Sequence, residues 1–136
     1  MQIRSLNGDE VLALKQALEL AAKLVDRPVP LQIDAVQELY NAIVDGDADM
    51  AEAKIALGLS FGQLIADKAR YEWVRVSDEY GEETCLSPIG VQLICAPISM
   101  IQKRIQSGNH ADLVELRDET ISSISSRMES GEYRPR

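Results

Sequence analysis

The sequence is poor in the side chains that bind metals and carry out nucleophilic catalysis. Its 136 residues include only two cysteines and one histidine, Cys85, Cys95 and His110, with neither a CxxC nor an HxxxH spacing. A structural zinc site needs three or four Cys or His ligands, so no metal site is expected. Neither the cysteines nor the serines lie in an elbow or glycine-rich signature, so no catalytic residue is expected and His110 is interpreted as structural.

Three longer patterns are also missing. No apolar run reaches 18 residues, and the first residues, MQIRSLNGDE, lack the charged-then-apolar order of a secretory segment. We therefore expect no membrane contact and a cytoplasmic protein with reduced cysteines. No GxGxxG follows a predicted strand, so neither a nucleotide cradle nor any other cofactor is expected.

Basic residues are scarce in the first 100 residues of the chain. Residues 1–100 hold 16 acidic and 8 basic side chains, whereas residues 101–136 hold six of each, so the net charge of −8 belongs to the first 100 residues. Residues 28–53 contain six carboxylates and no Lys or Arg. Because contacts to phosphates depend on cations, direct nucleic-acid binding is disfavoured and a basic protein partner is favoured.

Apolar residues at helical spacing predict three helices before residue 71. The first begins at an Asn7 cap with Glu10 three residues later, which is the spacing of a capping box, and it ends at DRPVP. The third begins at an Asp49 cap and runs to about Arg70. The second carries this apolar stripe: Ile33, Val36, Tyr40 and Ile43.

The stretch WVRVSDEYGEETCLSPIGVQLICAP differs from the helices on either side. It predicts strands near residues 72–77, 83–86 and 91–96, joined by the turns DEYGEE and SPIG. The first hairpin has two or three central residues, which leaves its register open. A SPIG turn centred between Pro88 and Ile89 places Leu86 opposite Val91 and the two cysteines on different faces.

The remaining residues predict two more helices. Pro97 suits the first turn of a short helix, and Asn109 is the expected cap of the last one. The fold class is therefore α+β, with three N-terminal helices, a three-stranded antiparallel meander, then a short helix and a long C-terminal helix. We expect one domain, residues 1–130, followed by a flexible tail, residues 131–136.

Two motifs in the helical part of the chain, one in a loop and one in a helix, have a structural and a functional interpretation. DGDADMAE alternates aspartates like a calcium loop, but position 6 counted from Asp45 is Met50 and position 12 is Ala56, so the loop pattern fails. Gly58 and Gly62 lie four apart on one helix face, at a cost of about 1 kcal/mol each relative to Ala. We expect a helix or the sheet to pack closely there, and the alternative is a ligand or partner approaching the same face.

The acids of the DEYGEE turn favour binding over catalysis. A tight hairpin tip rarely supplies the apolar pocket that raises a carboxyl pKa, whereas a rigid turn presents a fixed anionic patch with an aromatic anchor. The predicted partner-binding residues join this turn to the acidic loop after the second helix: Asp45, Asp47, Asp78, Glu79, Tyr80, Glu82 and Glu83.

The run from ALGLSFGQLI through WVRVSDEYGEE to CAPISMIQKRIQSGN resembles an uncharacterised bacterial family, domain of unknown function 3806. The resemblance covers roughly residues 55–109 and excludes the helices before residue 50. It implies the α+β fold and a bacterial cytosolic origin, and it assigns no active site. The matching positions are Gly58, Phe61, Gly62, Trp73, Asp78, Glu79, Gly81, Pro97, Lys103 and Arg104.

These patterns leave three functional hypotheses. The preferred one is a non-catalytic acidic binding protein that docks onto a basic partner, in its sharpest form an immunity protein that neutralises a cognate toxin. The second is a small enzyme or ligand-binding domain with a cleft near Gly58, Gly62 and the sheet. The third is a subunit that associates with copies of itself.

Overall fold

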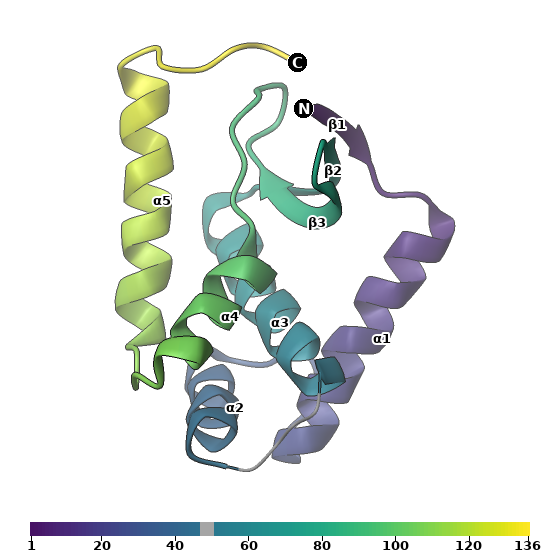
Figure 1. Ribbon diagram of the computed structural model, residues 1–136, viewed down its shortest axis with the longest axis vertical. Coiled ribbons are helices and arrows are strands. Elements are labelled where there is room, and N and C mark those ends of the chain that lie inside the picture. The colour runs from purple at the N-terminus through teal and green to yellow at the C-terminus, as the bar shows by residue number, and fades with distance from the viewer. Residues whose placement is uncertain (47–50) are drawn as a thin grey trace.

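The computed structural model describes residues 1–46 and 51–136. These residues form five helices and a small sheet, with the sheet at one end of the molecule and α3 running through the middle between α1 and α4 (Figure 1). The elements in chain order are β1 Gln2–Ser5, α1 Gly8–Val25, α2 Ile33–Asp45, α3 Ala51–Ala69, β2 Glu72–Asp78, β3 Gly81–Ser87, α4 Pro97–Ser107 and α5 Leu113–Glu129.

The predicted start of α1 is confirmed. The Asn7 side chain accepts a hydrogen bond from the Glu10 backbone at 2.9 Å, and the Glu10 carboxylate accepts one from the Asn7 backbone at 2.9 Å. The Glu10 carboxylate also forms a bidentate ion pair with the Arg4 guanidinium, with N–O distances of 2.7 and 2.9 Å. Strand β1 and helix α1 are thus joined by one carboxylate, and the hydrogen bonds from Arg4 and Asn7 lower the pKa of Glu10 to about 2.

Replacing Glu10 with glutamine is expected to destabilise the protein in a pH-dependent way. Because the pKa of Glu10 in the folded protein lies below its usual value of 4.5, the ionised group stabilises the fold fully above that value. The stabilisation fades as the pH falls toward about 2. The difference in free energy of unfolding between wild type and Glu10→Gln, measured by denaturant titration, should therefore be constant near neutral pH and shrink in acid. Glu19→Gln, an exposed position on the same helix, controls for the loss of one charge, and an equal pH trend there would contradict the assignment.

The order of the strands corrects the predicted fold class. The sheet is antiparallel with the order β1-β2-β3. Because β1 precedes the N-terminal helices and α1, α2 and α3 separate it from β2, the sheet is not the predicted meander. Strand β1 pairs Gln2 with Ser77 and Ser5 with Val74. It was not predicted because it is only four residues long and has one apolar side chain, Ile3, which joins a small cluster under the sheet.

The hairpin of β2 and β3 is confirmed, and its open register is settled. Asp78 is paired with Gly81, so Glu79 and Tyr80 are the two central residues of the turn. Gly81 has a φ of 127°, a conformation that favours glycine over other residues. This register pairs Cys85 with Val74 and turns the Cys85 thiol into the cluster under the sheet.

The strand predicted at residues 91–96 is wrong, as is its pairing of Leu86 with Val91. Leu86 instead exchanges two backbone hydrogen bonds with Cys95, both 2.9 Å, as an isolated bridge. Nearer the turn, the backbone groups of residues 90 and 92 pair with the last residues of the chain. The Gln92 N–H donates to the Arg134 carbonyl at 2.7 Å, and the Arg136 N–H donates to the Gly90 carbonyl at 2.9 Å.

Residues 134–136 are therefore hydrogen-bonded to the turn at residues 88–92. The Arg136 guanidinium donates to the carbonyl oxygens of Val91 and Pro88 at 2.8 and 2.7 Å, and it forms an ion pair with Glu72. These bonds lie beside the edge of β3, where the sequence pattern had placed a third consecutive strand.

Helix α3 lies at the centre of the core and contacts α1, α2, α4 and α5. Phe61 and Leu57 are fully buried in it, and fully buried Tyr40 enters the same cluster from α2. The predicted α2 stripe is confirmed by the burial of Val36, Tyr40 and Ile43. The predicted Asp49 cap of α3 lies outside the described residues.

The start of α5 differs from the prediction. Asp112, not Asn109, caps this helix, because its Oδ1 accepts hydrogen bonds from the Val114 and Glu115 backbone at 3.0 and 3.2 Å. The Asn109 carbonyl instead accepts a 2.6 Å hydrogen bond from the Tyr40 hydroxyl. Pro97 does begin α4, as predicted.

Both cysteines are free thiols buried in the protein. Burial raises the pKa of Cys85 and of Cys95 to about 12, so both remain protonated near neutral pH. Protonated, buried thiols are poor nucleophiles.

Candidate functional site

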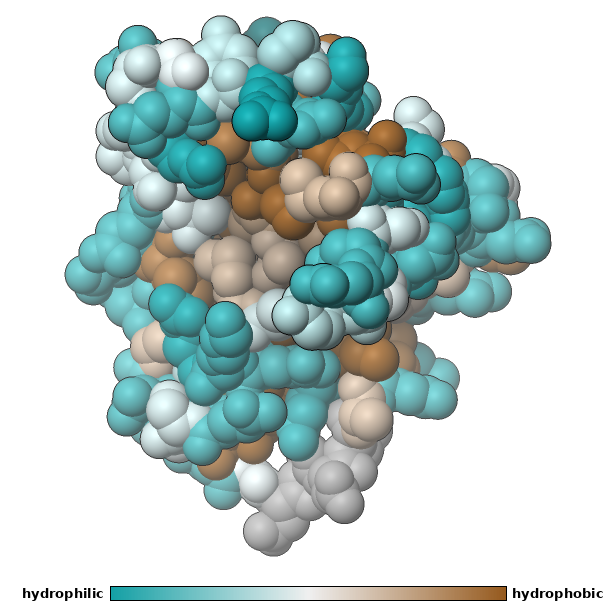
Figure 2. Space-filling view, turned by 45° about the horizontal axis from the view of Figure 1, so that its top comes forward, coloured by the Kyte–Doolittle hydropathy of each residue, from teal (hydrophilic) through white to brown (hydrophobic). Residues whose placement is uncertain are grey.

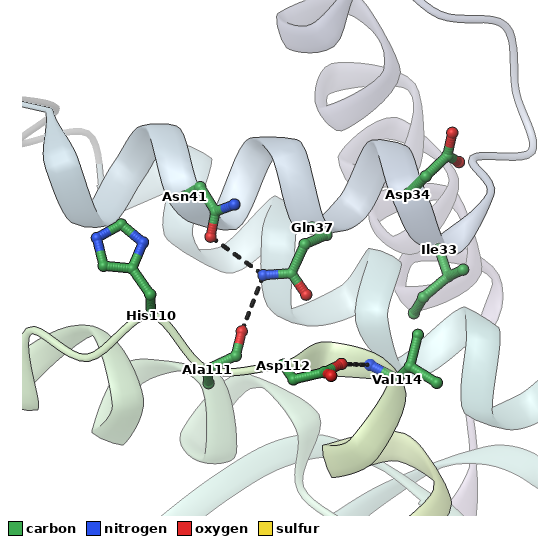
Figure 3. Close-up of a pocket in the computed structure, with 8 residues that line it drawn as sticks. All are labelled: Ile33, Asp34, Gln37, Asn41, His110, Ala111, Asp112 and Val114. Carbon is green, nitrogen blue, oxygen red and sulfur yellow. Dashed lines mark hydrogen bonds between the residues drawn. The ribbon is translucent and has the colours of Figure 1, made fainter.

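An open groove lies between α2 and the segment that leads into α5. It has a volume of about 480 Å³. Figure 3 shows α2 along one side and residues 110–114 along the other. The lining residues are Ile33, Asp34, Gln37, Asn41, His110, Ala111, Asp112 and Val114.

Gln37 joins the two walls across the floor of the groove. Its Nε2 donates to the Ala111 carbonyl at 2.8 Å, and its Oε1 accepts from the Leu113 backbone N–H at 2.8 Å. The same Nε2 donates to the Asn41 side chain at 3.1 Å, as the dashed lines in Figure 3 show. The Tyr40 hydroxyl adds a third hydrogen bond between α2 and this segment. The walls are therefore held at a fixed separation.

One end of the groove is apolar. Half-buried Ile33 and 41% exposed Val114 approach one another from opposite walls (Figure 3). Ala111 is half-buried and also lines the groove. This end offers apolar surface that is still in contact with water.

Among the described residues, no Lys or Arg lines the groove. Its α2 wall comes from residues 28–53 and its other wall from residues 105–116, and the sequence of both segments has no Lys or Arg. Asp34 and Asp112 line the groove and are exposed. Asp45, one of the predicted partner-binding residues, lies beside it, with its Oδ1 2.7 Å from Nε2 of His110. The groove is thus a place where cations are attracted.

The predicted residues of the β2–β3 hairpin are mostly engaged within the protein. Asp78 accepts a hydrogen bond from the Tyr80 backbone at 2.8 Å, Glu82 from Ser77 at 2.9 Å and Glu83 from Ser99 at 2.7 Å. Glu82 also lies 3.7 Å from the Arg75 guanidinium. Glu79 is exposed at the tip, beside the 90% exposed Tyr80.

The predicted acids do not form one patch. Asp45 ends α2, at the opposite end of the molecule from the sheet that carries the hairpin (Figure 1). Asp47 lies outside the described residues. The sequence pattern missed Asp34 as a site residue, and it missed the second wall entirely. The only signal for that wall is the run without Lys or Arg at residues 105–116.

The space beside Gly58 and Gly62 is filled. A β-carbon on Gly58 would lie 2.7 Å from the Cα of Ile98, and one on Gly62 would lie 2.5 Å from the Trp73 ring and 2.7 Å from Pro97. The expected close packing is therefore confirmed, with the start of α4 as the neighbour. The alternative of a ligand cleft at this face has no room in the fold.

A second hollow lies between α5 and residues 94–100, and it is less suited to a cationic partner. Its volume is about 410 Å³, and its apolar lining includes Ile94 and Met100. Figure 2 shows apolar surface hollowed between hydrophilic residues on this side of the molecule. Arg104, Arg127 and Glu119 also line it, so its charges are mixed.

Two kinds of feature are absent from the described part of the chain. Within residues 1–46 and 51–136, no three His, Cys, Asp or Glu side chains are grouped so that they could hold a metal ion. Over the same ranges, no helix combines the length and the apolar character needed to cross a bilayer.

The fold and the groove define a small α+β domain that presents an acidic, preformed surface. The chain belongs to the family described as Domain of unknown function (DUF3806), whose model matches residues 33–116. The match extends beyond the predicted 55–109 on both sides and includes α2, so both walls of the groove lie inside the family domain. Neither a curated protein nor a solved structure matches the chain.

Proposed function

We propose that this protein is a non-catalytic binding protein that docks onto a basic protein partner through the groove between α2 and residues 110–114. The observation that carries the proposal is the charge of the groove: both walls come from segments without Lys or Arg, and Asp34 and Asp112 lie on opposite walls. Opposite charges on a partner would be steered toward this surface and held in register.

The sharpest form of the proposal is an immunity protein in the bacterial cytosol that neutralises a basic toxin. An excess of eight negative charges on a chain of 136 residues supports fast association with a cationic protein. The hairpin tip, with Glu79 and Tyr80, is a secondary contact candidate because most of its other acids are bound within the protein.

Removing the charges of the groove is expected to weaken partner binding about tenfold or more, which corresponds to about 1.4 kcal/mol. The double variant Asp34→Asn/Asp112→Asn removes one charge from each wall, and asparagine still serves as a helix N-cap at position 112. The protein should be purified with the products of neighbouring genes, and the affinity for any basic partner measured by calorimetry at low and high salt.

Two controls separate the groove from general charge effects. Glu19→Gln/Glu129→Gln removes two exposed acids from α1 and α5 outside the groove and should leave the affinity within about twofold. Glu79→Gln/Tyr80→Ser tests the hairpin. Affinity that does not depend on salt, or that falls equally in the control and groove variants, contradicts the proposal.

A further inference from the structure

The length of the groove limits how much of a partner can lie in it. Its α2 wall extends from Ile33 to Asn41, which at about 1.5 Å per residue is about 12 Å. An extended chain advances about 3.3 Å per residue, so about three to four residues span this wall. A short extended segment of this length therefore matches the α2 wall from one end to the other.

The apolar end favours one aliphatic side chain in that segment. Ile33 and Val114 face one another there, and both keep part of their surface in water (Figure 3). A side chain between them would remove apolar surface from both walls at once, and this is the main source of affinity for an uncharged anchor. A polar anchor would gain little, because the Gln37 amide is already hydrogen-bonded to Ala111 and Leu113.

The residues on either side of the anchor would meet the acidic rim. Successive side chains of an extended segment point to opposite sides, so the neighbours of a buried anchor point back toward the mouth of the groove. Asp34 and Asp112 are exposed there, one on each wall. The two cap hydrogen bonds of Asp112 both go to Oδ1. Long cationic side chains are the ones that can reach a carboxylate from such positions.

We infer that the groove recognises an extended segment in which one aliphatic residue is flanked on both sides by Arg or Lys. The inference rests on the proposed function, since it places the basic partner in the same groove, and it adds the order of side chains that the partner presents. A polyanion would bind basic segments by their charge alone, whereas this groove would also require the aliphatic residue.

Three short peptides test the inference by NMR titration of the intact protein. The probes are acetyl-Gly-Arg-Leu-Arg-Gly-amide, the same peptide with serine in place of leucine, and the same peptide with both arginines replaced by glutamine. The Leu peptide should shift the signals of Ile33, Ala111 and Val114, and it should bind at least about threefold more tightly than the Ser peptide. The Gln peptide should bind more weakly than either.

Variants of the protein complete the test. Val114→Ser should bring the Leu and Ser peptides to equal affinity, and Asp34→Asn/Asp112→Asn should weaken both arginine peptides together. Equal binding of the Leu and Ser peptides to the wild type overturns the inference, as do shifts confined to the hairpin. Either result leaves the proposed function to be judged separately, by the affinity of the groove variants for the basic partner protein.

Discussion

Replacing Gly58 with alanine is expected to destabilise the protein by about 2 kcal/mol. The added methyl group would lie 2.7 Å from the backbone Cα of Ile98, which no side-chain rotation can move away. Overpacking of this kind costs up to about 3 kcal/mol, and the better helix propensity of alanine returns about 1 kcal/mol. Denaturant unfolding should show the loss as a lower midpoint with an unchanged slope.

Gly8 supplies the matched control for this substitution. It also lies in a helix, but a β-carbon there would have no atom within 4 Å, so Gly8→Ala should be neutral or slightly stabilising. If Gly58→Ala were as stable as Gly8→Ala, α4 would not pack against α3 as closely as the 2.7 Å approach of Ile98 requires.

Replacing Tyr40 with alanine is expected to have the larger effect, about 3–5 kcal/mol. Tyr40 is among the largest fully buried side chains, and its removal leaves a cavity between α2 and the core. Tyr40→Phe keeps the packing and removes only the 2.6 Å hydrogen bond to the Asn109 carbonyl, so its cost should be about 1 kcal/mol.

The comparison of the two Tyr40 variants divides packing from hydrogen bonding. Thermal and denaturant unfolding measure both, and circular dichroism checks that the helices persist in each variant. Equal losses in Tyr40→Ala and Tyr40→Phe would mean that the hydroxyl, and not the ring, is what Tyr40 contributes.

The parts of the fold that local chemistry determines could be predicted from the sequence. The capping box of Asn7 and Glu10 and the stripe that includes Tyr40 fixed the start of α1 and the buried face of α2. The hairpin turn followed from Gly81, since a positive φ is required there. These signals act within a few residues, so they do not depend on the rest of the chain.

The parts that failed depend on segments far apart in the sequence. Residues 91–96 are apolar on both faces, as a buried strand is, but the partners nearest the turn come from Arg134 and Arg136 at the other end of the chain. Strand β1 is stable because β2 pairs with it and Arg4 reaches Glu10, which its own four residues do not reveal. Tertiary partners decided these segments, and local propensity did not.

The candidate site shows the same division. Of the predicted partner-binding residues, Asp45 lies beside the groove, whereas Asp34, which lines it, was not predicted. The exposure of Asp78, Glu79 and Glu82 agrees with the turn pattern, but the pattern did not reveal the contacts that Ser77, Arg75 and Ser99 make with Glu82 and Glu83. The second wall meets α2 only through contacts such as that of Gln37 with Ala111, which span 74 positions of sequence.

Gln37 has a consequence for the energetics of association. Because its amide already ties both walls together in the free protein, an incoming segment finds a pre-organised receptor and loses little affinity to ordering it. Conformational entropy would then be lost mainly by the bound segment. A segment that is already rigid in its extended form should therefore bind more tightly.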